Sequence, residues 1–120
     1  MKLMVDEALK LLEESKGMAE NDRWVKHSIC VGNTAGVIAK ALNLDENFAK
    51  TLGYIHDIGK RNGYGNGVIP HGIGGYEYIK SLGYDDEYAS ICLTHSYLNN
   101  DINCVAGGIP EVTRYKYEFV

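Results

Sequence analysis

His56-Asp57-Ile58-Gly59-Lys60 is the stretch from which the fold and chemistry of this chain are best predicted, because it sets an imidazole beside a carboxylate. Together these two groups suit a borderline divalent metal ion. One histidine alone would be interpreted as a surface residue or a satisfied core residue. The chain has four histidines, and their order around this stretch predicts a common metal site. The other three stand on both sides of it: His27, His71 and His95.

Length and charge limit the class of protein. At 120 residues the chain is long enough for one domain. The net charge of −4 and the lack of a Lys/Arg-rich run argue against a nucleic-acid partner. No apolar stretch is long enough to cross a bilayer, and the first residues become acidic too soon for a signal peptide. We therefore expect a cytoplasmic protein with neither nucleic acid nor a membrane as partner.

Cysteine usage agrees with a reducing compartment. Cys30, Cys92 and Cys104 are odd in number, widely spaced and without a CxxC pattern. This favours free thiols over a disulfide framework. Zinc-finger spacing is absent, so we expect the three cysteines to be small buried apolar residues.

Apolar residues recur at helical spacing through most of the chain. Asp45 is placed to cap one helix, and Gly59 is placed to end it as a left-handed residue. The segments 60–69 and 99–109 are predicted loops, and no strand is predicted. The sequence thus indicates an all-α fold, an irregular bundle of about six helices. Their approximate ranges are 2–18, 23–42, 46–59, 70–82, 86–98 and 110–120.

The predicted elements are consistent with one domain over 1–120. Its parts are an N-terminal helix over 1–18 and a metal-site core over about 24–98. The last helix reaches Val120 in the middle of its apolar pattern and without a cap. We therefore expect the domain to be incomplete at its C-terminal end.

The helical pattern also predicts which residues point inward. In the second and fifth helices a histidine shares a face with apolar residues, and a buried histidine must be paired or ligated. The inward set of the second helix is His27, Val31, Thr34, Ile38 and Ala41. That of the third is Phe48, Ala49, Leu52, Ile55 and His56, and that of the fifth is Tyr88, Ile91, Cys92, His95 and Leu98.

Inward side chains on facing helices are where bundle proteins assemble metal sites. Asp57 could give one oxygen to each of two ions, and five candidate ligands are more than one tetrahedral ion needs. Two such ions would clamp a phosphoryl group and generate a hydroxide nucleophile. Other interpretations remain open for single residues. His71 could be a first-turn residue of its helix, and His95 a buried histidine bonded to a backbone carbonyl.

The order of these residues resembles the HD-domain superfamily, in its HDIG-type branch, over residues 24–96. The resemblance implies a helical metal-dependent phosphohydrolase or phosphodiesterase. It implies one divalent ion on His27, His56 and Asp57 and a second on His71 and His95. The metal would be Fe, Mn, Ni, Co or Zn.

The two basic residues after the His–Asp pair are candidates for contact with substrate. The resemblance implies that Lys60 approaches the substrate phosphate and takes part in catalysis with Asp57. Arg61 is a further candidate for substrate binding. Either side chain could instead complement the dipole at the C-terminal end of the preceding helix.

One part of the family pattern is missing. The resemblance calls for a final aspartate ligand on a later helix, and the acidic residues after His95 are Asp101, Glu111 and Glu118. Asp101 lies only six residues past His95. We therefore expect the final ligand beyond Val120, and its absence could weaken metal binding and leave this form inactive.

Neighbouring motifs narrow the substrate within the family. Gly63-Tyr64-Gly65 is not the Gly-Tyr-Pro signature of the cyclic-dinucleotide branch, and Gly59-Lys60-Arg61-Asn62 lacks the Glu-Asp pair of the alarmone branch. No nucleic-acid module is present. This favours hydrolysis of a nucleotide or other small phosphorylated metabolite. The alternatives are a di-iron oxygenase with the same ligand order, or a non-catalytic HD module that binds a ligand or partner.

Overall fold

The structure is a computed structural model, and it describes residues 1–63, 67–95, 97–98 and 101–105, with the backbone alone for the last two ranges. The chain is built of helices, as predicted, and within the described ranges no helix is both long and apolar enough to span a membrane. The helices are α1 (Val5–Glu14), α2 (Arg23–Ala41), α3 (Glu46–Ile55), the 3₁₀ helix η1 (Ile58–Asn62), α4 (His71–Ser81), α5 (Asp86–Ala89) and α6 (Ile91–Thr94). The strands are β1 (Tyr97–Leu98) and β2 (Asp101–Val105).

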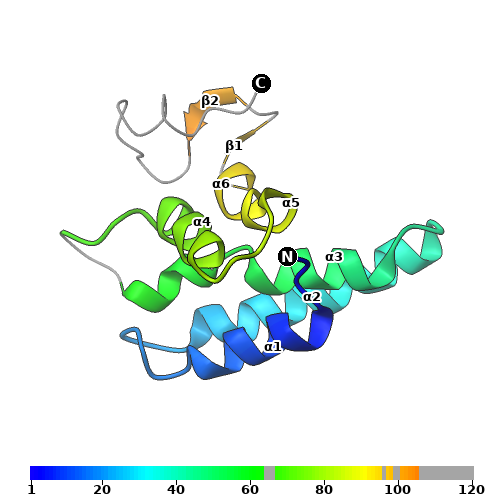
Figure 1. Cartoon of the computed structure of the whole chain (residues 1–120), viewed down its shortest axis with the longest axis horizontal. Helices are drawn as coiled ribbons and strands as arrows, with labels where there is room; N and C mark the ends of the chain where they lie inside the picture. Colours follow the sequence, from blue (N-terminus) through cyan, green and yellow to red (C-terminus); the bar gives the residue numbers. More distant parts are fainter. Residues whose placement is uncertain (64–66, 96, 99–100, 106–120) are drawn as a thin grey trace.

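The helices form two groups around one core (Figure 1). Helices α1, α2 and α3 pack side by side, and α4, α5 and α6 lie across from them. The segment that connects the groups is η1, which packs on α4. The core between them contains the largest fully buried apolar side chains, which are Leu12, Ile55, Ile58, Ile79 and Leu93.

Helices α2 and α3 approach each other closely because small residues line their contact. A Cβ atom on Gly53 of α3 would lie 2.5 Å from the Cα of Gly32, and one on Gly32 would lie 2.2 Å from the ring of Tyr54. Only glycine fits such a contact between backbones. The buried face of α2 is therefore made of Trp24, Val25, Ser28, Gly32, Gly36 and Ala39.

The inward face predicted for the second helix is thus wrong. Thr34, Ile38 and Ala41 are exposed, and His27 lies at the edge of the buried face. The prediction relied on the spacing of apolar residues along α2. The face that packs on α3 is instead determined by glycines, which do not add to that apolar pattern.

The start of α3 is as predicted and its end is not. The side chain of Asp45 accepts a hydrogen bond from the N–H of Phe48 at 3.0 Å, which confirms the cap. The helix stops at Ile55, and η1 occupies part of the predicted loop 60–69. Gly59 is not in the left-handed region. It is needed because a Cβ atom there would lie 1.9 Å from the carbonyl oxygen of His71.

The predicted fifth helix is divided into α5 and α6, with Ser90 between them. After α6 the chain forms the antiparallel pair β1–β2, in which Tyr97 is opposite Val105. This pair replaces the end of the predicted helix and part of the predicted loop. Its sequence contains β-branched Ile102 and Val105, which favour strands. The predicted sixth helix lies outside the described residues.

The cysteines differ in environment. Cys92 is buried, and its thiol donates to the carbonyl of Ile55 at 3.3 Å. Burial raises the pKa of this thiol, so it is an inert core residue, as predicted. Cys30 is exposed, contrary to the prediction, because it lies on the solvent side of α2. The side chain of Cys104 lies outside the described part.

Candidate metal centre

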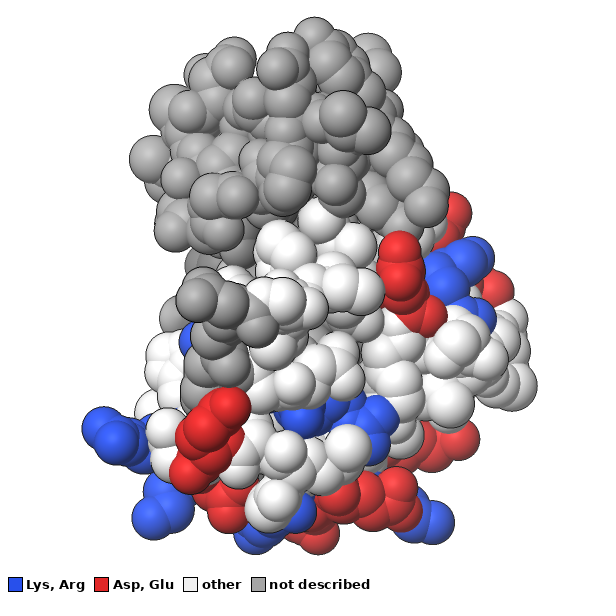
Figure 2. Space-filling view, turned by 90° about the vertical axis from the view of Figure 1, so that its left-hand side faces the viewer, with Lys and Arg blue, Asp and Glu red and all other residues white. Residues whose placement is uncertain are grey.

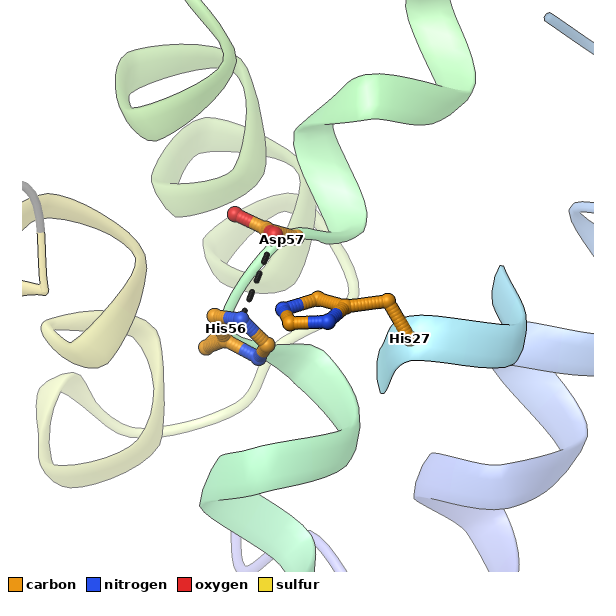
Figure 3. Close-up of side chains that lie close together, drawn as sticks. All are labelled: His27, His56 and Asp57. Carbon is orange, nitrogen blue, oxygen red and sulfur yellow. Dashed lines mark ion pairs between the residues drawn. The ribbon is translucent and has the colours of Figure 1, made fainter. Parts of the chain in front are cut away.

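The five predicted ligands meet where four helices converge. His27 extends from α2 toward the end of α3, where His56 and Asp57 follow each other (Figure 3). His71 is the first residue of α4, and His95 directly follows α6. We call these five residues the Asp57 cluster.

Asp57 is the centre of the cluster. It lies between α3 and η1 and is 5% exposed. Its Oδ1 is 2.9 Å from Nε2 of His95 and 3.3 Å from Nε2 of His71. Its Oδ2 is 3.2 Å from Nε2 of His56 and 3.4 Å from Nζ of Lys60. The two carboxylate oxygens therefore face different histidines.

The ligand atoms divide into two sets of three, each close enough to share one ion. One set is His27, His56 and Asp57, and the other is Asp57, His71 and His95; within each, the atoms lie within 4.8 Å of one another. The imidazole rings also contact each other. The ring centroids of His27 and His56 are 5.6 Å apart, and those of His56 and His95 are 5.1 Å apart.

Backbone carbonyls fix which nitrogen of two histidines faces Asp57. Nδ1 of His56 is 2.6 Å from the carbonyl oxygen of Gly53, and Nδ1 of His95 is 2.9 Å from that of Ile91. A carbonyl only accepts, so each Nδ1 must carry the hydrogen and donate it. In the neutral ring, Nε2 then presents a lone pair toward a carboxylate, which also only accepts. A cation, either a proton or a metal ion, must therefore lie between them.

The electrostatics of the cluster agree with this arrangement. Burial lowers the pKa of His56, but the hydrogen bond and charge of Asp57 outweigh it, and the net shift is upward. Burial raises the pKa of Asp57, but hydrogen bonds from His56, His71 and His95 hold it well below its usual range. Without a metal, the carboxylate of Asp57 stays ionised, and the positive form of His56 is favoured beside it.

The residues present fit a divalent metal ion. Donor atoms on one ion, at about 2.0–2.2 Å from it and at angles of roughly 90–110°, stand about 2.9–3.5 Å apart. The three distances between Asp57 oxygens and histidine nitrogens, 2.9, 3.2 and 3.3 Å, lie in this interval. Metal-bound histidines usually donate their second N–H to a carbonyl or carboxylate, as His56 and His95 do.

Glycines bring the cluster together. A Cβ atom on Gly59 would lie 1.9 Å from the carbonyl oxygen of His71, and one on Gly72 would lie 2.8 Å from the carbonyl oxygen of Cys92. A Cβ atom on Gly75 would lie 3.0 Å from the sulfur of Cys92. Helices η1, α4 and α6 thus pack backbone against backbone, which places Asp57, His71 and His95 within reach of each other.

Lys60 and Arg61 have different surroundings. The Lys60 side chain is 28% exposed and forms an ion pair with Asp57, which places its ammonium at the rim of the cluster. The Arg61 guanidinium stacks on Tyr78, 4.0 Å from the ring centroid, and donates to the Met18 sulfur at 3.0 Å. Tyr78 is seven residues along α4 from His71, about 10 Å at 1.5 Å per residue. The Arg61 guanidinium is therefore engaged by Tyr78 and Met18, and its role in substrate binding stays a prediction.

Sequence analysis missed the groups that orient the imidazoles. The carbonyls of Gly53 and Ile91 lie three and four residues before His56 and His95, a spacing that a helix makes available to any histidine. His95 contacts a backbone carbonyl through Nδ1 and faces Asp57 through Nε2, so the carbonyl contact does not prevent it from acting as a ligand. The residue is exposed, not buried as the alternative interpretation had it. The side chains of Asp101, Glu111 and Glu118, weighed as further ligands, lie outside the described part.

Comparison with known proteins gives the family. The HD domain family model matches residues 24–108, which include all five residues of the Asp57 cluster. No solved structure matches the chain. Members of the matched family are typically metal-dependent phosphohydrolases that bind divalent metals. Because the match covers well over half of the sequence and contains the whole cluster, the chain belongs to the HD-domain family.

Proposed function

We propose that this protein is a metal-dependent phosphohydrolase that acts on a nucleotide or another small phosphorylated metabolite. Membership of the HD-domain family supports the reaction class. The observation that carries the proposal is that the two oxygens of Asp57 face different histidines. Oδ1 faces His71 and His95, and Oδ2 faces His56. A carboxylate held in this way can serve two ions at once.

The roles of the side chains follow from their positions. Two bound divalent ions would supply Lewis acidity toward a phosphoryl group and a hydroxide nucleophile at neutral pH. Asp57 and the four histidines would hold them, and the Gly53 and Ile91 carbonyls would keep His56 and His95 in the ligating tautomer. Lys60 is placed to neutralise negative charge on a phosphoryl group beside Asp57 Oδ2.

The surface is consistent with a small substrate. On the face shown in Figure 2, Lys and Arg side chains are interspersed with Asp and Glu, and the described residues there form no broad basic patch. A nucleic-acid partner would call for such a patch. This face therefore offers no broad basic surface to a nucleic acid. Together with the net charge of −4, this supports a small phosphorylated molecule as the proposed partner.

One observation favours a second function. Each ligand set contains two histidines and one carboxylate, which is the donor set of many non-haem iron oxygenases. A di-iron oxygenase is therefore the alternative, and its substrate would be oxidised with consumption of dioxygen.

Turnover of metal-loaded protein separates these functions. The purified chain is stripped with a chelator and loaded with Mn²⁺, Co²⁺, Ni²⁺ or, without air, Fe²⁺. Phosphate release is measured on a panel of nucleoside monophosphates and sugar phosphates, and dioxygen uptake is measured in parallel. We expect metal-dependent phosphate release that Asp57→Asn abolishes and Asp6→Asn, an exposed change in α1, leaves intact.

The other outcomes are informative. Dioxygen uptake with iron and no phosphate release would favour the oxygenase. Bound metal without either turnover would contradict both enzymatic functions and indicate a module that binds a ligand or partner.

A further inference from the structure

A groove of about 340 Å³ opens beside the Asp57 cluster, between α2, α3 and α6. The three helices can be followed in Figure 1. Five apolar side chains form most of its wall, and all are incompletely buried by the fold. They are Val31 and Ala35 from α2, Ala49 and Leu52 from α3, and Ile91 from α6.

The groove and the cluster share two residues. His56 and His95 line the groove, and the Nε2 atoms of the same two rings face Asp57 at 3.2 and 2.9 Å. The rings meet edge to face, with centroids 5.1 Å apart. The groove therefore adjoins the cluster at these two rings.

The chemistry of the wall selects against polar groups. Among the described residues that line the groove, none besides the two histidines has a polar side chain. The Gly53 carbonyl is already occupied by Nδ1 of His56. Sugar hydroxyls or the hydrogen-bonding edge of a base would lose their water there and find no partner, which is unfavourable.

The size of the groove suits a small apolar group. A cavity of roughly 150 Å³ holds benzene, and typical ligand pockets begin at about 300 Å³. The groove thus has room for one or two aromatic rings or a short alkyl chain. Burial of such a group against Val31, Leu52 and Ile91 removes apolar surface from water and stabilises the complex.

We propose that this groove is the subsite for an apolar, uncharged part of the substrate, an aromatic or alkyl group carried on the phosphate. The inference rests on the proposed function and adds the chemical class of the substrate. The phosphoryl group would lie at the Asp57 cluster on the side of Lys60, and its apolar substituent would extend along α2 and α3, away from Lys60.

Kinetics on two esters test the preference. The metal-loaded protein is assayed with 1-naphthyl phosphate and with glycerol 2-phosphate, which differ in the polarity of the group on the phosphate. We expect kcat/KM to be about tenfold or more higher for the naphthyl ester, since pocket contacts with a few carbons give discrimination of this size. Inorganic phosphate should inhibit both reactions equally.

Two substitutions that fill the groove test whether the preference for the naphthyl ester arises there. Ala35→Phe fills the groove from α2, and Ala49→Phe fills it from α3. Each should lower kcat/KM for 1-naphthyl phosphate about tenfold and change that for glycerol 2-phosphate by less than about twofold. Ala41→Phe makes the same change at an exposed position of α2 outside the groove and should alter neither. Metal content and thermal unfolding confirm that each variant keeps its fold and its ions.

A binding measurement separates this inference from the proposed function. Neutral 1-naphthol, which needs no metal, is titrated into the protein while NMR follows the methyl groups of Ala35, Ala49 and Leu52. Saturable shifts in wild type, lost in both filling variants, support the groove even if no ester is hydrolysed.

Two results would overturn the inference. One is the absence of such shifts, as expected if another part of the chain or a second copy fills the groove. The other is equal turnover of the two esters, which would leave the phosphohydrolase proposal standing.

Discussion

At the scale of single residues, Asp57 and His56 stabilise each other's charged forms. Burial alone would make both groups neutral, because it lowers the pKa of His56 and raises that of Asp57. The hydrogen bond and charge of Asp57 reverse the shift of His56, and hydrogen bonds from His56, His71 and His95 reverse that of Asp57. Protons therefore occupy the site in the metal-free protein, and a metal ion must displace them.

Metal affinity should fall as the pH is lowered. The raised pKa of His56 means that its ring keeps its proton to a higher pH than an ordinary histidine does. Each proton displaced on binding lowers the affinity about tenfold per pH unit below that pKa. Competition with a chelator, measured at a series of pH values, gives the slope. An affinity that does not vary through the neutral range would show that no histidine proton is displaced.

The free energy of unfolding of the metal-free protein should depend on pH through the same two groups, Asp57 and His56. The folded pKa of Asp57 lies below the ordinary value of 3.8, and that of His56 lies above 6.5. The contribution of Asp57 is present above pH 3.8 and is lost as the pH falls through its folded pKa. The contribution of His56 is present below pH 6.5 and is lost as the pH rises through its folded pKa.

Comparison with Asp57→Asn isolates this effect. We expect the difference in free energy of unfolding between wild type and Asp57→Asn to be largest from pH 3.8 to 6.5 and smaller at alkaline pH. Urea unfolding of the chelator-treated proteins measures it. A difference that increases from neutral to alkaline pH would contradict the pairing.

At the scale of elements, glycines decide how closely the helices approach. The contact of Gly59 with the carbonyl of His71 sets the distance between η1 and α4. Asp57 stands before η1 and His71 begins α4, so this contact also sets the distance between two ligands. The packing of the bundle and the geometry of the cluster thus depend on the same atoms.

Gly59→Ala should damage the fold and the cluster together. The added Cβ atom would lie 1.9 Å from the His71 carbonyl oxygen and 2.6 Å from the Gly75 nitrogen, both backbone atoms. Overpacking of this kind costs about 1–3 kcal/mol, and the shift of α4 should weaken metal binding as well. Urea unfolding and a metal titration measure the two effects.

Gly74→Ala is the matched control in α4. Its Cβ atom would meet only the side-chain nitrogen of exposed Asn62, at 3.1 Å. Alanine is favoured over glycine inside a helix by about 1 kcal/mol, so stability should be unchanged or higher. Equal losses in Gly59→Ala and Gly74→Ala would show that the close contact at Gly59 has no special importance.

At the scale of the whole molecule, sequence patterns predicted the helical class and most helix positions, because apolar spacing and caps such as Asp45 act locally. The order of the histidines around His56 and Asp57 also predicted which residues would converge, although His27 lies at the edge of the buried face of α2 and not within it. The buried face of α2 and the end of α3 could not be predicted, because both depend on contacts between glycines far apart in the sequence. The environment of Arg61 likewise depends on tertiary contacts. The tautomers of His56 and His95 depend on local carbonyls, but the sequence does not indicate that the ring nitrogens bond to them.

If the Asp57 carboxylate serves two metal ions, the number of ions bound per chain must depend on it. Metal-free wild type, His27→Ala, His71→Ala, Asp57→Asn and the control Asp6→Asn are titrated with Mn²⁺, and bound metal per chain is measured. Wild type and the control should bind about two ions. His27→Ala and His71→Ala should each lose a different one, and Asp57→Asn should lose both. Full metal content in Asp57→Asn would contradict the claim.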